Sequence, residues 1–118
     1  MRVFLLTKTP QSERTRLCLR LVAKSPDALV YLAGDGVYNL LDKAEAGKAS
    51  QSVRTAQAGR EDDGRDLAAL VPRHRIMACR EDLEARSVSA DGKATVPADF
   101  YENLVDDMMR EGNRIYTF

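Results

Sequence analysis

Short apolar runs alternate along this sequence with stretches of helical periodicity, and no other feature restricts the possible folds as much. Residues 3–6 and 28–33 are runs rich in Val, Leu and aromatic residues, each of a length typical of a buried strand. Residues 12–24 lie between them, with apolar side chains at helical spacing and Ser12 in the position of an N-cap. Strands that alternate with helices favour a mainly parallel sheet covered on both faces, so we expect an α/β fold with three α/β/α layers.

The second half of the chain continues the same alternation. Residues 73–79 (RHRIMAC) are expected to form a third strand, and residues 80–87 (REDLEARS) a helix that follows it directly. Residues 98–112 again have helical periodicity and end at Gly112, the residue type favoured in the position after a helix. We expect residues 113–118 (NRIYTF) to form the last strand.

One long polar stretch interrupts this pattern. Between residues 42 and 66 the only strongly apolar residue is Val53, which indicates a polar loop or an insertion. The whole chain has 118 residues, the size of one ordinary domain with a core of its own. We therefore expect a single domain over residues 1–118, with the loop or insertion at about 42–66.

The charge balance and the apolar runs exclude several classes of partner. Lys and Arg number 18 and Asp and Glu also number 18, so no long-range field attracts nucleic acid or an anionic membrane. The opening MRVFLLTKTP has an apolar run too short for a signal peptide or a membrane span. We expect a cytoplasmic protein that binds neither nucleic acid nor membranes directly.

Candidate site residues follow the predicted strands. In open α/β sheets, sites form in the crevice beyond the carboxyl ends of the strands, where loops and helix N-termini converge. Three segments are expected there, and their candidate residues are Lys8 in TKTP, Asp35 and Gly36 in GDGVYN, and Cys79 with Arg80. The alternative interpretation is that Lys8 and Asp35 are solvated loop charges and that GDGVYN is an ordinary turn.

Cys79 has two opposed interpretations. At a helix N-terminus, the dipole and unpaired backbone N–H groups stabilise a thiolate, and nearby arginines such as Arg80 and Arg86 would add to this. Glu81 and Asp82 lie in the first turn of the same helix and would repel a thiolate. The sequence is equally consistent with a small apolar side chain that ends a buried strand.

Neither the remaining cysteine nor the glycine pattern indicates a cofactor site. Cys18 shares a helix face with Leu21 and Val22, so core packing accounts for it, with a second sulfur-handling thiol as the alternative. The two cysteines lack the close pairing of a zinc or dithiol site, and GDGVYN lacks the third glycine of a dinucleotide fingerprint. We expect no metal and no organic cofactor.

The sequence resembles the DsrE/DsrF/DsrH family, which includes the TusB, TusC and TusD subunits of the sulfur relay. The resemblance lies in four blocks that follow one another along the chain: LLTKTP, VYLAGDGVYNLL, IMACREDLEARS and NRIYTF. Cys79 matches the place of the sulfur-accepting cysteine of DsrE and TusD, with Ser87 where a glycine is usual. The TKTP loop, the segment EDLEAR and a first-helix cysteine at Cys18 are closer to the DsrH/TusB branch.

The resemblance implies a function and an assembly. It implies a DsrE-like fold, flavodoxin-like in outline, in which Cys79 accepts sulfane sulfur as a persulfide from a donor protein and passes it to an acceptor. It also implies a homo-oligomer, a dimer or trimer, or a subunit of a hetero-oligomeric complex. The last helix agrees with assembly, because Tyr101, Met108 and Met109 give it more apolar surface than one core face needs.

Two other functions stay open. One is a non-catalytic interaction subunit of DsrH/TusB type, which close packing of Cys79 beneath neighbouring side chains would favour. The other is a small-ligand-binding module that uses the strand-end crevice through Lys8, Asp35 and backbone N–H groups.

Overall fold

The computed structural model describes residues 1–41 and 67–118, and the loop or insertion predicted at 42–66 lies outside these described residues. They contain a four-stranded sheet in which every strand pairing is parallel, in the order β3-β2-β1-β4. The strands are β1 (Arg2–Leu6), β2 (Ala28–Leu32), β3 (Ile76–Ala78) and β4 (Arg114–Thr117). The predicted alternation of strands and helices in a parallel sheet is thus confirmed.

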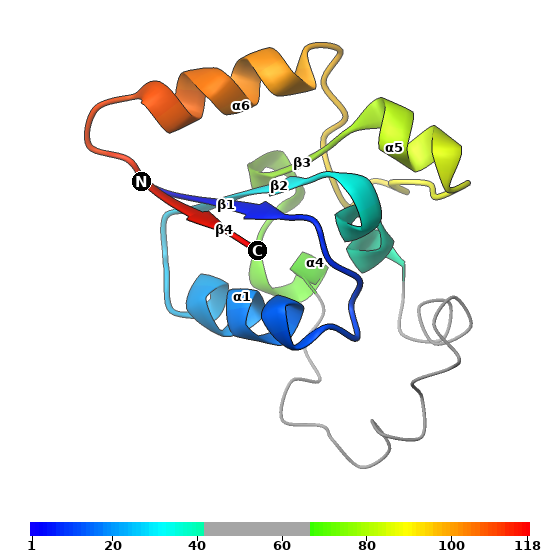
Figure 1. Ribbon diagram of the computed structural model, residues 1–118, viewed down its shortest axis with the longest axis horizontal. Helices are drawn as coiled ribbons and strands as arrows, with labels where there is room; N and C mark the ends of the chain where they lie inside the picture. The colour runs from blue at the N-terminus through cyan, green and yellow to red at the C-terminus, as the bar shows by residue number, and fades with distance from the viewer. Residues whose placement is uncertain (42–66) are drawn as a thin grey trace.

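Helices cover both faces of this sheet, as the prediction of three layers requires. Figure 1 shows α6 (Phe100–Met109) on one face, and α1 (Glu13–Ala23) with the short α4 (Leu67–Leu70) on the other. The 3-10 helix η1 (Gly34–Leu40) follows β2, and α5 (Arg80–Ala85) packs against it beyond the carboxyl ends of the strands.

The core is divided into two clusters by the sheet. Side chains of a strand alternate between its faces, so β1 directs Phe4 and Leu6 towards α1 but Val3 towards α6. Every residue of β2 is buried, because this central strand has a neighbour on each side and helices on both faces. The α1 face holds Cys18 and Val22, and the α6 face holds Phe100 and Leu104.

Helix α1 begins as the sequence predicts. The Ser12 hydroxyl accepts a hydrogen bond of 3.1 Å from the Arg14 N–H, which satisfies one of the free backbone donors at the start of the helix. The helix then presents Thr15, Cys18 and Val22 to the sheet at helical spacing.

Three local predictions need correction. Arg73–Arg75 form a 3-10 turn (η3) and not strand, because Pro72 fixes the backbone before them and its carbonyl accepts the Arg75 N–H at 2.9 Å. Helix α6 ends at Met109, and Gly112, with φ of 91°, lies further on in the turn that leads into β4. The flavodoxin-like outline fails in strand order, since such sheets run 2-1-3-4-5 and here β3 is added beyond β2.

Candidate functional site

Cys79 lies at the junction that the sequence predicts. Strand β3 ends at Ala78, and Cys79 is the N-cap residue of α5. Its N–H donates to the Leu32 carbonyl at 3.1 Å, which continues the ladder with β2, and its own carbonyl accepts the Leu83 N–H at 3.0 Å. The same residue therefore finishes the sheet and starts the helix.

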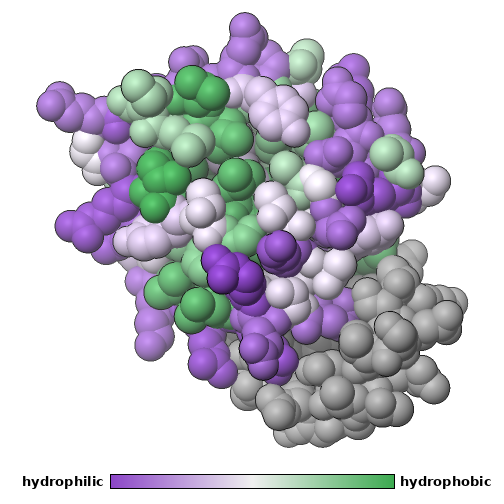
Figure 2. Space-filling model, in the orientation of Figure 1, coloured by the Kyte–Doolittle hydropathy of each residue, from purple (hydrophilic) through white to green (hydrophobic). Residues whose placement is uncertain are grey.

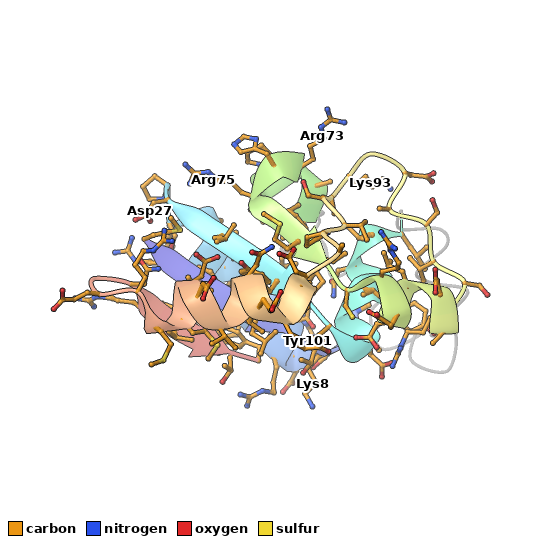
Figure 3. All side chains as sticks on the ribbon, turned by 90° about the horizontal axis from the view of Figure 1, so that it is seen from above. Lys8, Asp27, Arg73, Arg75, Lys93 and Tyr101 are labelled. Atoms are coloured by element: carbon orange, nitrogen blue, oxygen red, sulfur yellow. The ribbon has the colours of Figure 1, made fainter. Side chains whose placement is uncertain are left out.

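The thiol of Cys79 is closed off from solvent. Cys79 is 1% exposed and belongs to the cluster on the α6 face of the sheet. Its Sγ lies 3.4 Å from Oε1 of Glu81, to which it donates, and 4.0 Å from the Tyr101 hydroxyl. Tyr101 comes from α6 (Figure 3), packs edge-on against Phe100 at 5.0 Å between ring centroids, and is itself 56% exposed. Tyr101 thus contacts the thiol through its hydroxyl and is itself open to solvent.

The local electrostatics favour the thiol over the thiolate. Burial raises the pKa of Cys79; the Asp82 N–H lowers it, while the side chains of Glu81 and Asp82 raise it further. The net shift is upward, so the two carboxylates and the apolar surroundings outweigh the helix N-terminus. Helix α5 has only six residues, which limits the dipole that it can contribute.

Arg86 does not supply a free positive charge to the sulfur. Arg86 forms an ion pair of 3.0 Å with Asp35 and one of 3.5 Å with Asp82, and the Asp35 hydrogen bond raises the pKa of Arg86. Oδ2 of Asp82 also accepts the Gly34 N–H at 2.7 Å. This network joins α5 to η1. Arg80 is exposed at the first position of α5.

Gly36 has a packing role. A Cβ at this position would lie 2.0 Å from the backbone oxygen of Leu6 and 3.2 Å from Cα of Thr7. Only glycine therefore allows η1 to approach the end of β1 this closely. Gly36 and Asp35 both serve to position the loop after β2, whereas the sulfur of Cys79 contacts Glu81 and Tyr101.

Lys8 lies in a separate pocket of the strand-end region. That pocket is at the carboxyl ends of β1 and β4, and it is lined by Leu5, Thr7, Lys8, Arg14, Thr117 and Phe118. Because β2 separates β1 from β3, the ends of these two strands are about 10 Å apart. The structure therefore places Lys8 with Arg14, and Asp35 with Arg86, and does not unite Lys8, Asp35 and Cys79 in one site. Figure 3 shows Lys8 and the η3 residues Arg73 and Arg75 on opposite sides of the molecule.

Cys18 is a core residue. It is fully buried between α1 and the sheet, and this burial raises the pKa of its thiol to about 12. A group with this pKa stays protonated at neutral pH, so it lacks the thiolate that sulfur transfer uses. The packing interpretation of Cys18 therefore agrees with its environment.

Tyr101 is the site residue that sequence reasoning missed. Tyr101 follows Cys79 by 22 positions. Because it stacks beside other apolar residues of the last helix, the sequence predicted that it belongs to an assembly surface and did not predict its contact with the thiol. Only the crossing of α6 over the end of β3 brings the two together. No pattern in the sequence signals that contact.

The described residues contain neither a metal-binding cluster nor a helix that could cross a membrane. Over residues 1–41 and 67–118, no three His, Cys, Asp or Glu side chains gather in a way that would hold a metal ion. The helices in those ranges are each too short or too polar to cross a membrane.

Comparison with known proteins does not extend the resemblance. No protein-family model and no curated protein matches the chain. The likeness to the DsrE/DsrF/DsrH family therefore rests on the four sequence blocks alone.

Proposed function

We propose that this chain is a cytoplasmic, non-catalytic interaction subunit of a sulfur-relay complex, of the DsrH/TusB type. The observation that carries the proposal is the closure of Cys79, which is 1% exposed beneath Tyr101 and donates to Glu81. A persulfide carrier needs an accessible thiol that ionises readily, whereas the pKa of Cys79 is raised. In this role the sulfur passes from donor to acceptor on other chains of the complex.

The outer face of α6 supports a role in assembly. Phe100 and Leu104 pack against the sheet, yet the helix also exposes a stripe of four apolar side chains at helical spacing: Tyr101, Val105, Met108 and Met109. Contiguous exposed apolar surface marks interaction sites, and Met adapts well to the shape of a partner. We refer to these four residues as the α6 stripe.

One observation favours a second candidate, the persulfide carrier itself. Tyr101 is largely exposed and belongs to another element, so a partner that binds the α6 stripe would also contact the cover of the thiol. With Tyr101 displaced, the Cys79 thiolate would attack the sulfane sulfur of a donor persulfide. A new S–S bond then forms on Cys79, the bond within the donor breaks, and the donor leaves as a thiolate.

A persulfidation assay tests the interaction-subunit proposal, because stoichiometric sulfur on Cys79 of the wild type would contradict it. The purified chain is incubated with a low-molecular-weight persulfide or a sulfur-loaded cysteine desulfurase, and mass spectrometry then detects added sulfur. We expect no added sulfur on Cys79 of the wild type, and one added sulfur atom on Tyr101→Ala. Tyr101→Phe keeps the ring and removes only the hydroxyl that lies 4.0 Å from Sγ, so it should gain less sulfur than Tyr101→Ala.

Further variants assign the modified thiol. The double variant Tyr101→Ala with Cys79→Ser should gain no sulfur, whereas Tyr101→Ala with Cys18→Ser should gain as much as Tyr101→Ala alone. Stoichiometric sulfur on Cys79 of the wild type would overturn the interaction-subunit proposal and establish the carrier. A Tyr101→Ala variant that stays unmodified would show that Tyr101 is not what shields the thiol.

A further inference from the structure

The pocket at the carboxyl ends of β1 and β4 has a charge pattern of its own. Six residues line it, and none of them is acidic: Leu5, Thr7, Lys8, Arg14, Thr117 and Phe118. Basic and acidic residues are equal in number over the whole chain, so two cations without a lining carboxylate are a local excess of positive charge. The pocket has a volume of about 520 Å³, which is within the range of small-ligand pockets.

The two cations of this pocket have no carboxylate partner within the part of the chain that the structure describes. Arg2 and Arg86, by contrast, each form an ion pair with an aspartate. Among the described residues, no carboxylate lies within ion-pair distance of the Lys8 ammonium or the Arg14 guanidinium. Both side chains are exposed, and Figure 3 shows Lys8 extending outward at the edge of the molecule. Their positive charges are therefore available to an anion.

The loop that carries Lys8 is held in place by buried polar side chains. Asn39, which is 9% exposed, donates to the Lys8 carbonyl at 3.1 Å and to the Gly36 carbonyl at 3.0 Å. Thr15 is fully buried, and its hydroxyl donates to the Thr9 carbonyl at 2.6 Å. Buried hydrogen bonds of this kind fix the loop before a ligand arrives, which lowers the entropic cost of binding.

The walls of the pocket combine hydroxyl groups with apolar surface. The Phe118 carbonyl accepts the Thr7 N–H at 3.0 Å and the Thr7 hydroxyl at 2.8 Å, which joins the end of β4 to the loop after β1. Thr117 is the second lining residue with a hydroxyl, and Leu5 and Phe118 are the apolar ones. Figure 2, in the orientation of Figure 1, shows hydrophilic and apolar surface side by side where β4 ends. An anion with an apolar body matches this lining.

We propose that this pocket binds a small phosphate monoester with an apolar body. Two cations match the nearly double negative charge of such a phosphate at neutral pH, whereas a carboxylate carries only one. A guanidinium binds two phosphate oxygens through parallel N–H donors, which is the role of Arg14, and the Lys8 ammonium adds a point charge. Leu5 and Phe118 contact the apolar body. Glu13 precedes Arg14 in the first turn of α1 but is not among the lining residues.

Titration of the full chain with phenyl phosphate, followed by calorimetry and by NMR of the backbone amides, tests the site. We expect saturable binding of one molecule per chain, with the largest shifts at the amides of Thr7, Lys8 and Phe118. Inorganic phosphate and benzoate are the matched probes, because the first lacks the apolar body and the second carries a single negative charge. Each should bind more weakly than phenyl phosphate, whose own binding should weaken as salt is added.

Substitutions of the two cations assign the binding to this pocket. Lys8→Gln and Arg14→Gln should each weaken the binding of phenyl phosphate about tenfold, because each removes a charged hydrogen-bond donor to the anion. Lys24→Gln, at the C-cap of α1, and Arg73→Gln, in η3, remove exposed cations outside the pocket and should leave the affinity unchanged. All four side chains are exposed, so the variants should fold, which far-UV circular dichroism verifies.

Several results would overturn this site. Absence of saturable binding of phenyl phosphate would refute it directly. An equal loss of affinity in the pocket variants and in the two controls would show that the anion responds to surface charge in general. Inorganic phosphate or benzoate that binds as tightly as phenyl phosphate would refute the assigned ligand class. The pocket does not include Cys79, so these outcomes are independent of the persulfidation result that tests the proposed function.

Discussion

At the scale of single residues, Ser87 is a non-glycine residue in a backbone conformation that favours glycine. It follows the C-cap of α5 in the left-handed region, with φ of 55°. Its N–H donates to the Glu84 carbonyl at 3.3 Å, and the Val88 N–H donates to the Leu83 carbonyl at 2.9 Å. These two bonds define a Schellman motif, in which glycine is the favoured residue at this position.

Replacement of Ser87 by glycine should therefore stabilise the protein. A side chain in the left-handed region costs about 1 kcal/mol, so Ser87→Gly should raise the free energy of unfolding by about that amount. Urea denaturation at neutral pH measures the change. The control is Ser89→Gly, at an exposed position without a positive φ, which should be neutral or slightly destabilising. An equal change in the free energy of unfolding in Ser87→Gly and Ser89→Gly would contradict the claim that the backbone is strained at Ser87.

At the scale of elements, α6 both closes the thiol site and supplies the apolar stripe. Phe100 and Leu104 anchor it to the sheet, and the Tyr31 hydroxyl in β2 donates to a carboxylate oxygen of Asp107 in its last turn. Burial and this bond to Asp107 raise the pKa of Tyr31, so its hydroxyl stays protonated and remains a donor. The position of Tyr101 over Cys79 therefore depends on contacts made elsewhere along the helix.

Loosening α6 should uncover the thiol. Tyr31→Phe removes the hydrogen bond to Asp107 and leaves the ring in place, at a cost of about 1 kcal/mol in the free energy of unfolding. We expect Cys79 to react several-fold faster with a thiol reagent, measured against the wild type under native conditions. Tyr38→Phe, in η1, is the matched control and should leave that rate unchanged. An unaltered rate in Tyr31→Phe would mean that α6 does not depend on this bond.

At the scale of the whole molecule, Cys18 should make stability depend on pH in the alkaline range. Its pKa rises from 9.0 to about 12 on folding, because burial disfavours the thiolate. Above about pH 9 the unfolded chain releases this proton and the folded chain retains it, so the free energy of unfolding falls as pH rises towards 12. Below pH 9 both states hold the proton and the effect is absent.

The variant Cys18→Ala isolates this contribution. At pH 7 it should be less stable than the wild type by about 1 to 2 kcal/mol, because it leaves a small cavity. At pH 10 the difference should shrink by about 1 kcal/mol, because the variant has no thiol to ionise at this position. Tyr31 and Cys79 also have raised pKa values, but the wild type and Cys18→Ala both contain these residues, so their contributions cancel in the difference. Urea denaturation at pH 7 and pH 10 measures the difference in the free energy of unfolding between the two proteins. The same difference at both pH values would contradict a raised pKa of Cys18.

The order of the elements and the parallel sheet were predictable from the sequence, because they depend on local periodicity. The apolar runs predicted at residues 3–6, 28–33 and 73–79 contain strands that end at the predicted end or one residue before it, and Ser12 caps the first helix. The same reasoning placed Cys79 correctly between β3 and α5. It failed at Arg73–Arg75, where the preceding Pro72 decides the backbone conformation, and at strand order, which the pairing of distant strands decides.

The environment of the candidate site was decided by tertiary structure alone. Whether Cys79 is exposed depends on Tyr101, which reaches it only because α6 crosses the sheet above the end of β3. Whether Lys8 meets the thiol depends on the strand that separates β1 from β3. The sequence by itself thus determined the order of the strands and helices along the chain and their approximate ends. Burial and charge at a strand end arise from side chains of other elements, so only the packed structure determines the state of the thiol and the pocket at the ends of β1 and β4.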